Sequence, residues 1–144
     1  MSDDRDAPGT GRVSVDLPGF SHVNPIPAAS RKGPFVFSGA FSGRDPATGE
    51  LPATLDAQMA VVFQHVRTLM DHVGGSVDDV VKMTFWLADP RDRAALNREW
   101  VTAFPDEASR PARHVLKADL DGGVLVQADV IAVLGTAGAV GAAG

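Results

Sequence analysis

Arg113 is the residue whose chemistry the sequence shows most directly, in the run Arg110-Pro111-Ala112-Arg113. Pro111 fixes its own φ and favours extended geometry in the residue before it, so Arg113 is expected at the mouth of a strand. Two β-patterned runs, residues 114–118 and 124–133, follow it. A guanidinium offers a planar fork of donors that matches both oxygens of a carboxylate. Arg113 is therefore a candidate carboxylate-binding residue, with a surface ion pair as the alternative.

The composition of the chain limits the classes of function. Its 144 residues, 44% of them hydrophobic, fit one domain with a buried core. The net charge of −5 and the lack of a basic block argue against nucleic acid as a partner. Without cysteine there are no disulfides and no thiolate ligands. We see no secretory signal and no apolar run of roughly 18 residues, so we expect a soluble cytoplasmic protein with no membrane partner.

The two ends of the chain differ from its middle. Residues 1–15 are polar and rich in Asp, Gly and Pro, which predicts a disordered or loosely attached arm. The pattern leaves open one extra strand near the N-terminus. Residues 136–144 are almost entirely Gly and Ala and are expected to form a disordered tail. Residues 16–135 are predicted to form a single domain.

The middle of the chain alternates between strand and helix patterns. Residues 35–39 predict a short strand that ends at Gly39, and a turn follows at residues 45–49. A helix is predicted from Thr54, its N-cap, to the pair Gly74-Gly75. Its apolar stripe consists of Leu55, Met59, Val62, Val66, Leu69 and Val73. A strand at residues 80–88 and a second helix with Pro90 in its first turn come next.

This order of elements predicts an α+β fold. Each helix has one apolar face, so both are expected to pack on the same side of one mixed sheet. Two helices cannot cover both faces of the sheet, and the other face of the strand at residues 80–88 is too apolar for water. We therefore expect an oligomer that buries it.

Six short motifs, in order, resemble the reactive intermediate deaminase family (RidA, formerly YjgF). They are Phe37-Ser38-Gly39, the run from Asp45 to Pro52, Gln58, Val81-Lys82-Met83-Thr84, Asn97-Arg98-Glu99-Trp100 and Arg110-Pro111-Ala112-Arg113. The resemblance extends over residues 25–133, which is most of the chain.

The resemblance implies a chorismate-mutase-like fold and a homotrimer with a central barrel and clefts between subunits. Many members hydrolyse small imines or enamines such as 2-aminoacrylate to 2-keto acids and ammonia, without a metal or an organic cofactor. In this family the counterpart of Arg113 holds the substrate carboxylate. The implied partner is thus a small carboxylate-bearing metabolite.

Other positions match the family pattern less specifically than Arg113 does. Ser38 and Gly39 are expected to line the cleft, where a residue without a Cβ lets a ligand approach the backbone, although Gly39 could instead mark a bulge. Asn97 matches an asparagine near the cleft, but asparagines are also common on helix surfaces. Val115 and Ile26 occupy positions expected to influence substrate choice.

Two departures from the family pattern concern water activation. Gln127 stands where deaminating members have a glutamate, and Ile26 stands in place of their N-terminal tyrosine. An amide can orient water but has no basicity near neutral pH. Asp129, on the same strand face, is an alternative base or an intersubunit ion-pair partner. The sequence therefore leaves open both imine hydrolysis and a protein that binds a carboxylated metabolite, or transforms it differently, in a specialised pathway.

The remaining candidate side chains are interpreted as structural. His114 follows Arg113 directly and should face the other side of the sheet. His65 and His72 are seven residues apart on the first helix without a nearby carboxylate cluster, so no metal site is predicted. Trp100 lies on an apolar stripe and is interpreted as core or interface.

Overall fold

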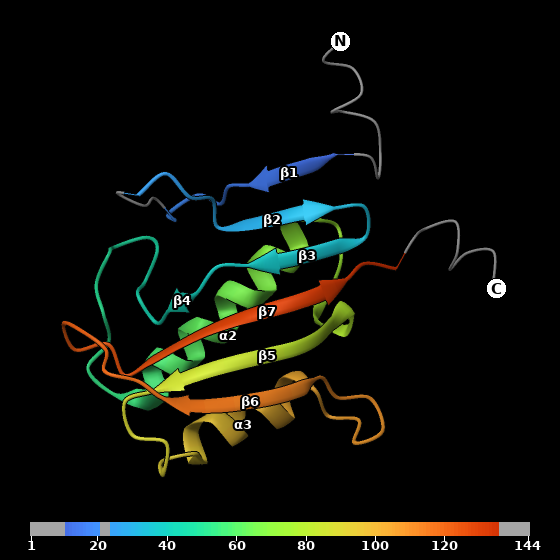
Figure 1. Ribbon diagram of the computed structural model, residues 1–144. Coiled ribbons are helices and arrows are strands. Elements are labelled where there is room, and N and C mark those ends of the chain that lie inside the picture. Colours follow the sequence, from blue (N-terminus) through green and yellow to red (C-terminus); the bar gives the residue numbers. More distant parts are fainter. Residues whose placement is uncertain (1–10, 21–23, 136–144) are drawn as a thin grey trace.

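A computed structural model describes residues 11–20 and 24–135, which contain one seven-stranded sheet and two α-helices (Figure 1). The strands are β1 (Arg12–Val15), β2 (Ala29–Lys32), β3 (Phe35–Ser38), β4 (Phe41–Ser42), β5 (Val80–Leu87), β6 (Ala112–Lys117) and β7 (Val126–Val133). The helices are α2 (Leu55–His72) and α3 (Ala94–Ala103), with a 3-10 turn, η1 (Val77–Asp79), before β5.

The sheet is mixed and has the order β1-β2-β3-β7-β5-β6, with β4 beside β7. β5 and β6 are parallel, and the other pairs are antiparallel. Both helices lie on one side of the sheet, and the side toward the viewer in Figure 1 has no helix over it. The predicted α+β arrangement, with two helices on one face, is confirmed. We call the uncovered side the open face.

α2 forms as its sequence predicts. The Thr54 hydroxyl accepts a hydrogen bond from the Ala57 backbone N–H (3.2 Å) and so caps the first turn. Gly74 has a φ of 83°, the left-handed geometry that ends many helices. The expected stripe is buried from Met59 to Val73, while Leu55 is half-buried. This helix therefore supplies one layer of the core.

α3 begins at Ala94, so the prediction that Pro90 lies in its first turn is wrong. The Asp89 carboxylate accepts hydrogen bonds from the backbone and side chain of Arg91. A local turn of this kind satisfies a backbone N–H outside the helix and competes with helix formation. Arg93 becomes the N-cap residue.

Part of the predicted disordered arm is also wrong, because Arg12–Val15 form β1. β1 pairs with β2 in antiparallel register, and Val15 enters the core with 6% of its surface exposed. Burial of the Val15 side chain stabilises this segment in an ordered form, although its polar composition predicted disorder. Residues 1–10 of the predicted arm and the predicted tail, residues 136–144, lie outside the described residues.

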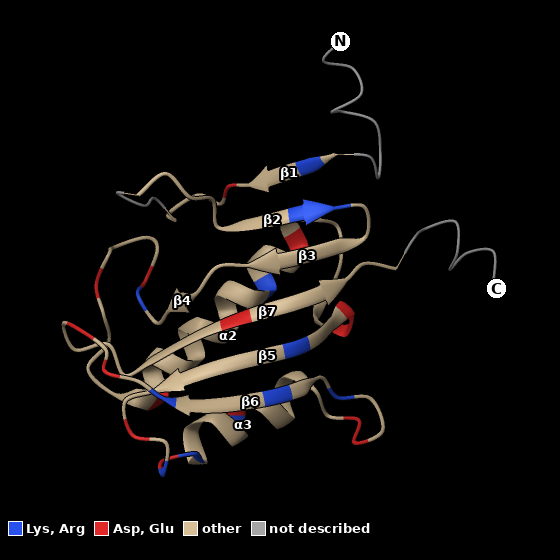
Figure 2. Cartoon of the chain, viewed as in Figure 1, with Lys and Arg blue, Asp and Glu red and all other residues tan. Residues whose placement is uncertain are grey.

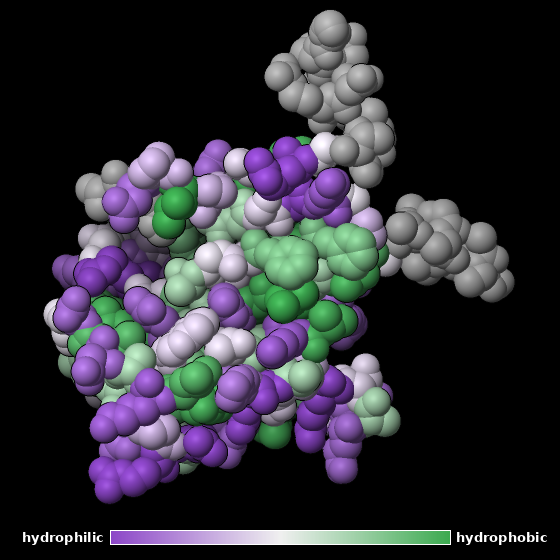
Figure 3. All heavy atoms as spheres, viewed as in Figure 1, coloured by the Kyte–Doolittle hydropathy of each residue, from purple (hydrophilic) through white to green (hydrophobic). Residues whose placement is uncertain are grey.

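Alternation along the strands sorts side chains between the core and the open face. On β7 the residues facing the helices are buried, namely Val126, Ala128, Val130 and Ala132. Gln127, Asp129, Ile131 and Val133 point the other way. Large apolar side chains remain exposed on this open face, among them Phe35, Phe37 and Val133, and Figure 3 shows hydrophobic surface gathered over β3 and the end of β7.

Candidate half-sites on the two faces of the sheet

Arg113 lies on β6 at the edge of the sheet and points toward α3. β6 pairs in parallel with β5, where Arg113 is opposite the fully buried Met83, so both side chains are on the helix side. Nη1 of Arg113 donates a hydrogen bond to Oδ1 of Asn97 (3.0 Å). Its guanidinium carbon lies 5.0 Å from the centroid of the Trp100 ring. The amide and the ring orient the guanidinium and leave other donors for a ligand.

The surroundings of Arg113 favour an anionic ligand. Burial lowers its pKa, and the positive charge of Arg93 lowers it further. Among residues 11–20 and 24–135, ion pairs join Arg91 to Asp89 and Arg98 to Asp56, and none involves Arg113. The expected alternative, a surface ion pair of Arg113, is thus not found in the described part of the chain.

Two neighbours complete this side of the sheet. Val115, two residues after Arg113, faces the same way and packs partly against the core. Trp100 has only 8% of its surface exposed and packs edge-on against Phe85 and Phe104, which places it in the core as expected. It also contacts Arg113, which sequence reasoning missed. We call Asn97, Arg113 and Val115 the arginine half-site.

Ser38 and Gly39 lie where β3 parts from β7. The Ser38 hydroxyl accepts a hydrogen bond from the Val130 backbone N–H (2.9 Å) and donates one to the Gly39 carbonyl (2.7 Å). The Gly39 N–H donates to the Ala28 carbonyl (2.8 Å). A Cβ on Gly39 would lie 3.6 Å from the nearest atom, an ordinary contact. Nothing within the described subunit therefore requires glycine at this exposed position.

Gln127 lies on β7 between Ser42 of β4 and Trp86 of β5, on the open face. Asp129 follows on the same face, and burial raises its pKa while Lys82 and Thr84 partly offset this shift. Ile26, which leads into β2, is 54% exposed. We group Ile26, Ser38, Gly39 and Gln127 as the glutamine half-site by their family positions. Gln127 faces the open side, whereas Ser38 alternates with Phe37 and faces the same side as the buried Val36.

The structure does not bring the two half-sites together within one subunit. Arg113 and Gln127 lie on opposite faces of the sheet with β5 between them. Strand spacing and a register offset of three residues put their Cα atoms roughly 14 Å apart. A small ligand held by Arg113 is therefore out of reach of Gln127 of the same subunit.

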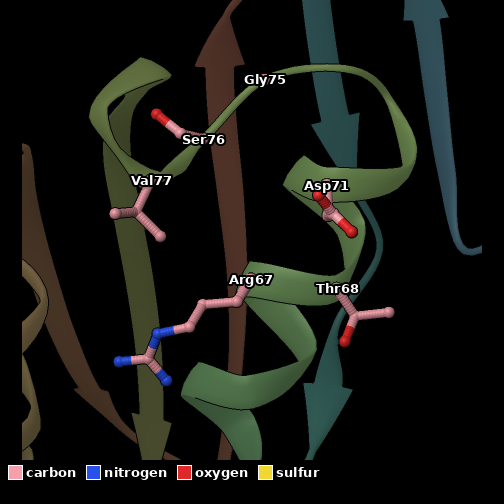
Figure 4. A pocket seen from close by; sticks show the side chains of 6 residues that line it. All are labelled: Arg67, Thr68, Asp71, Gly75, Ser76 and Val77. Carbon is pink, nitrogen blue, oxygen red and sulfur yellow. The ribbon is translucent and has the colours of Figure 1, made fainter.

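Two hollows of the described surface contain none of the predicted site residues. One, of about 410 Å³, is lined by Arg67, Thr68, Asp71, Gly75, Ser76 and Val77. The side chains of Arg67 and Thr68 leave α2 toward different sides, so its polar groups do not converge (Figure 4). Another, of about 260 Å³, includes His65 and Phe41 but no predicted site residue.

The charge distribution and the side chains of the described residues were compared with what a nucleic-acid, metal or membrane site requires. Lys and Arg segments lie on β1, β2, β5 and β6, an acidic segment lies on β7 between them, and no continuous basic strip crosses the described sheet and loops (Figure 2). Within the described ranges, no three potential metal-binding side chains cluster together. No helix in the same ranges has the length and apolar character needed to cross a membrane.

Comparison with known proteins gives a consistent picture. The family model described as Endoribonuclease L-PSP matches residues 22–134. The Putative reactive intermediate deaminase TdcF of Escherichia coli is 31% identical over 103 residues, which is 70% of this chain and 80% of TdcF. The 2-iminobutanoate/2-iminopropanoate deaminase of the same organism is 33% identical over 91 residues, covering 62% of this chain and 71% of the relative.

Solved structures agree with these relatives. The crystal structure of E. coli TdcF with bound serine has a TM-score of 0.77 and 25% identity, covering 85% of this chain and 99% of TdcF. RidA from the Antarctic bacterium Psychrobacter matches with a TM-score of 0.77 and 29% identity over 85% of this chain and 99% of that protein. The chain therefore belongs to the RidA/YjgF family.

Proposed function

We propose that the protein hydrolyses small carboxylate-bearing imines or enamines, of the 2-aminoacrylate type, to 2-keto acids and ammonia in the cytoplasm. The observation that carries this proposal is Arg113, a half-buried guanidinium oriented by Asn97 and Trp100 and without an ion-pair partner in the described part of the chain. Names of relatives support the substrate class, since one is a 2-iminobutanoate/2-iminopropanoate deaminase. The endoribonuclease of the family description fits the acidic net charge of −5 less well.

We propose further that the site is completed across an interface. Arg113 and Gln127 lie on opposite faces of one sheet, so Arg113 of one subunit and Gln127 of another can meet where the two residues of one subunit cannot. A homotrimer whose open faces form a central barrel would also cover the exposed side chains of Phe35 and Phe37. The proposed cleft then lies between neighbouring subunits.

The proposed reaction needs only water as a co-reactant. Arg113 binds the carboxylate and fixes the position of the neighbouring imine carbon, and orientation alone can contribute several kcal/mol. Water held by Gln127 adds to this carbon, a C–O bond forms, and collapse of the adduct breaks the C–N bond and releases ammonia. Gln127 does not take up the proton. Asp129, whose pKa is raised by burial, can accept it, as can bulk water.

The decisive experiment follows the lifetime of a 2-imino acid generated by an L-amino acid oxidase and trapped with semicarbazide. Wild-type protein should shorten this lifetime, and Arg113→Ala should lower the rate on the order of a hundredfold because a charge-assisted, bidentate contact is lost. Arg98→Ala is the matched control, since Arg98 is also on this side of the sheet but pairs with Asp56. Equal imine lifetimes with and without wild-type protein would contradict the proposal.

One observation favours a second function, the binding of a carboxylated metabolite without hydrolysis or its conversion by another reaction. Gln127 has no basic group to activate water. In that case wild-type protein would bind 2-keto acids through Arg113 and leave the imine lifetime unchanged, and Gln127→Glu would create deaminase activity. Activity of the wild type would rule this alternative out.

A further inference from the structure

Arg93 lies beside the arginine half-site and was not a candidate from the sequence. It is the N-cap of α3, and its carbonyl accepts the backbone N–H of Asn97 (2.9 Å). Arg93, Asn97 and Trp100 are therefore spaced at i, i+4 and i+7, which places them along one face of the helix. Two of these three residues contact Arg113 directly. The same helix face that orients Arg113 thus carries a second guanidinium.

The charge of Arg93 acts on Arg113. Arg93 contributes to the lowered pKa of Arg113, after burial. Within residues 11–20 and 24–135, neither arginine forms an ion pair, whereas nearby Arg91 pairs with Asp89 and Arg98 pairs with Asp56. Two like charges in proximity repel each other, and an anion bound between them removes that repulsion. A carboxylate bound in the fork of Arg113 would leave the charge of Arg93 available to another group.

We propose that the ligand of this site carries a second anionic group, a carboxylate or a phosphate, which Arg93 binds while Arg113 holds the first carboxylate. This inference rests on the proposed function of the arginine half-site and narrows its substrate class. The favoured substrates are imines or enamines derived from acidic or phosphorylated amino acids. Because Arg93 is exposed, the second anionic group lies toward solvent, and the imine carbon stays beside Arg113.

Calorimetry with product-like 2-keto acids tests the inference. The probes are 2-oxobutanoate with one anionic group, 2-oxoglutarate with a second carboxylate, and 3-phosphohydroxypyruvate with a phosphate. Wild-type protein should bind at least one doubly anionic probe more tightly than 2-oxobutanoate. Arg93→Gln should reduce this preference, expressed as a ratio of Kd values, by roughly threefold to tenfold, as for a partly exposed charge pair. The probe with the larger loss identifies the second group as carboxylate or phosphate.

Arg91→Gln is the matched control, because it removes the same charge two residues earlier in a side chain already paired with Asp89. This variant should keep the wild-type ratio. An unchanged ratio in Arg93→Gln, an equal loss in both variants, or no preference in the wild type would each overturn the inference. If 2-oxobutanoate still binds in an Arg113-dependent way, the proposed function survives that result. Absence of binding by every probe would overturn both.

Discussion

At the scale of single residues, His65 shows how burial determines protonation. It lies on α2 with 3% of its surface exposed, packs edge-on against Phe20, and its Nε2 is 2.9 Å from the Arg44 carbonyl oxygen. A carbonyl oxygen accepts, so Nε2 carries the proton and donates. Burial lowers the pKa of His65 despite this hydrogen bond and the charge of Asp45. The neutral ring is therefore the form that the folded protein favours.

This shift predicts acid sensitivity. The folded-state pKa lies below the unfolded value of about 6.5, so the stability contributed by neutral His65 is complete above that value and is lost as pH falls toward the folded pKa. The loss is at most about 1.4 kcal/mol per pH unit in this interval. His65→Gln keeps a donor near the Arg44 carbonyl but does not titrate. Its unfolding free energy should depend less on pH between 7 and 5 than that of wild type, measured by urea denaturation.

The exposed His72 on the same helix provides the control, and His72→Gln should retain the wild-type pH dependence. Identical pH profiles for His65→Gln and the wild type would show that another group is responsible.

Arg113 could be selected from the sequence because its motif is local. Its contact with Asn97 joins residues sixteen positions apart, and its contact with Trp100 depends on how α3 docks on the sheet. Local patterns carry no such docking information, so the contacts had to come from the structure. Arg93 had one available signal, its i, i+4 spacing to Asn97, once the start of α3 is known.

At the scale of elements, β4 and the turn after it are fitted closely to α2. A Cβ on Gly43 would lie 2.5 Å from the Gln58 backbone oxygen. The buried Gln58 side chain donates to the carbonyls of Pro52 (2.8 Å) and Gly123 (3.0 Å) and accepts from the Leu125 N–H (2.8 Å). This one residue therefore connects α2 to the chain before it and to the entry of β7.

Substitution by alanine should affect stability at Gly43 and activity at Gly39. Gly43→Ala forces backbone apart and should cost about 1–3 kcal/mol of unfolding free energy. Gly39→Ala has room within the subunit and should change stability little, but it should slow imine hydrolysis, since its Cβ would stand in the proposed cleft. Urea denaturation and the imine-lifetime assay distinguish the two effects. Normal turnover by a folded Gly39→Ala variant would remove Gly39 from the cleft.

The elements with a long hydrophobic period were predictable, as was the four-residue β3, whereas the short strands β2 and β4 were not. α2 combines an apolar stripe, a threonine cap and a terminal glycine, which all indicate the same helix. β2 and β4 have four and two residues, too few for an alternating pattern to emerge, and they exist because β3 and β7 offer hydrogen-bonding partners. The start of α3 was predicted too early because a single side chain, the carboxylate of Asp89, stabilises a turn before the helix, and no periodic pattern indicates such a turn.

At the scale of the whole molecule, the open face determines the proposed assembly. Phe37 on this face is 51% exposed, and Val101 on α3, on the other side of the sheet, is 48% exposed. Phe37→Lys places a charge where another subunit is proposed to pack and should shift the protein from trimer toward monomer in sedimentation velocity. Val101→Lys, the matched control, should leave the trimer intact. A wild-type monomer, or equal behaviour of both variants, would contradict an interface on the open face.

The two-layer architecture followed from apolar periodicity, because each amphipathic element must bury one face. The separation of the candidate residues into two half-sites could not be inferred from this periodicity, because it depends on which strands become neighbours. β5 lies between β6 and β7 although β6 and β7 are consecutive in the chain. Sequence order alone would have placed Arg113 and Gln127 on adjacent strands.

The positions of the two tryptophans allow each half-site to be followed by intrinsic fluorescence. Trp100 touches Arg113, and Trp86 pairs with Gln127 on the open face. The chain has two tryptophans and no tyrosine, so its near-ultraviolet fluorescence comes from these two rings. A ligand bound at Arg113 would change the electric field at Trp100, while the proposed subunit packing would remove water from Trp86. Ligand binding and assembly can thus be followed as separate spectral signals in the unlabelled protein, with Trp86→Phe and Trp100→Phe isolating each.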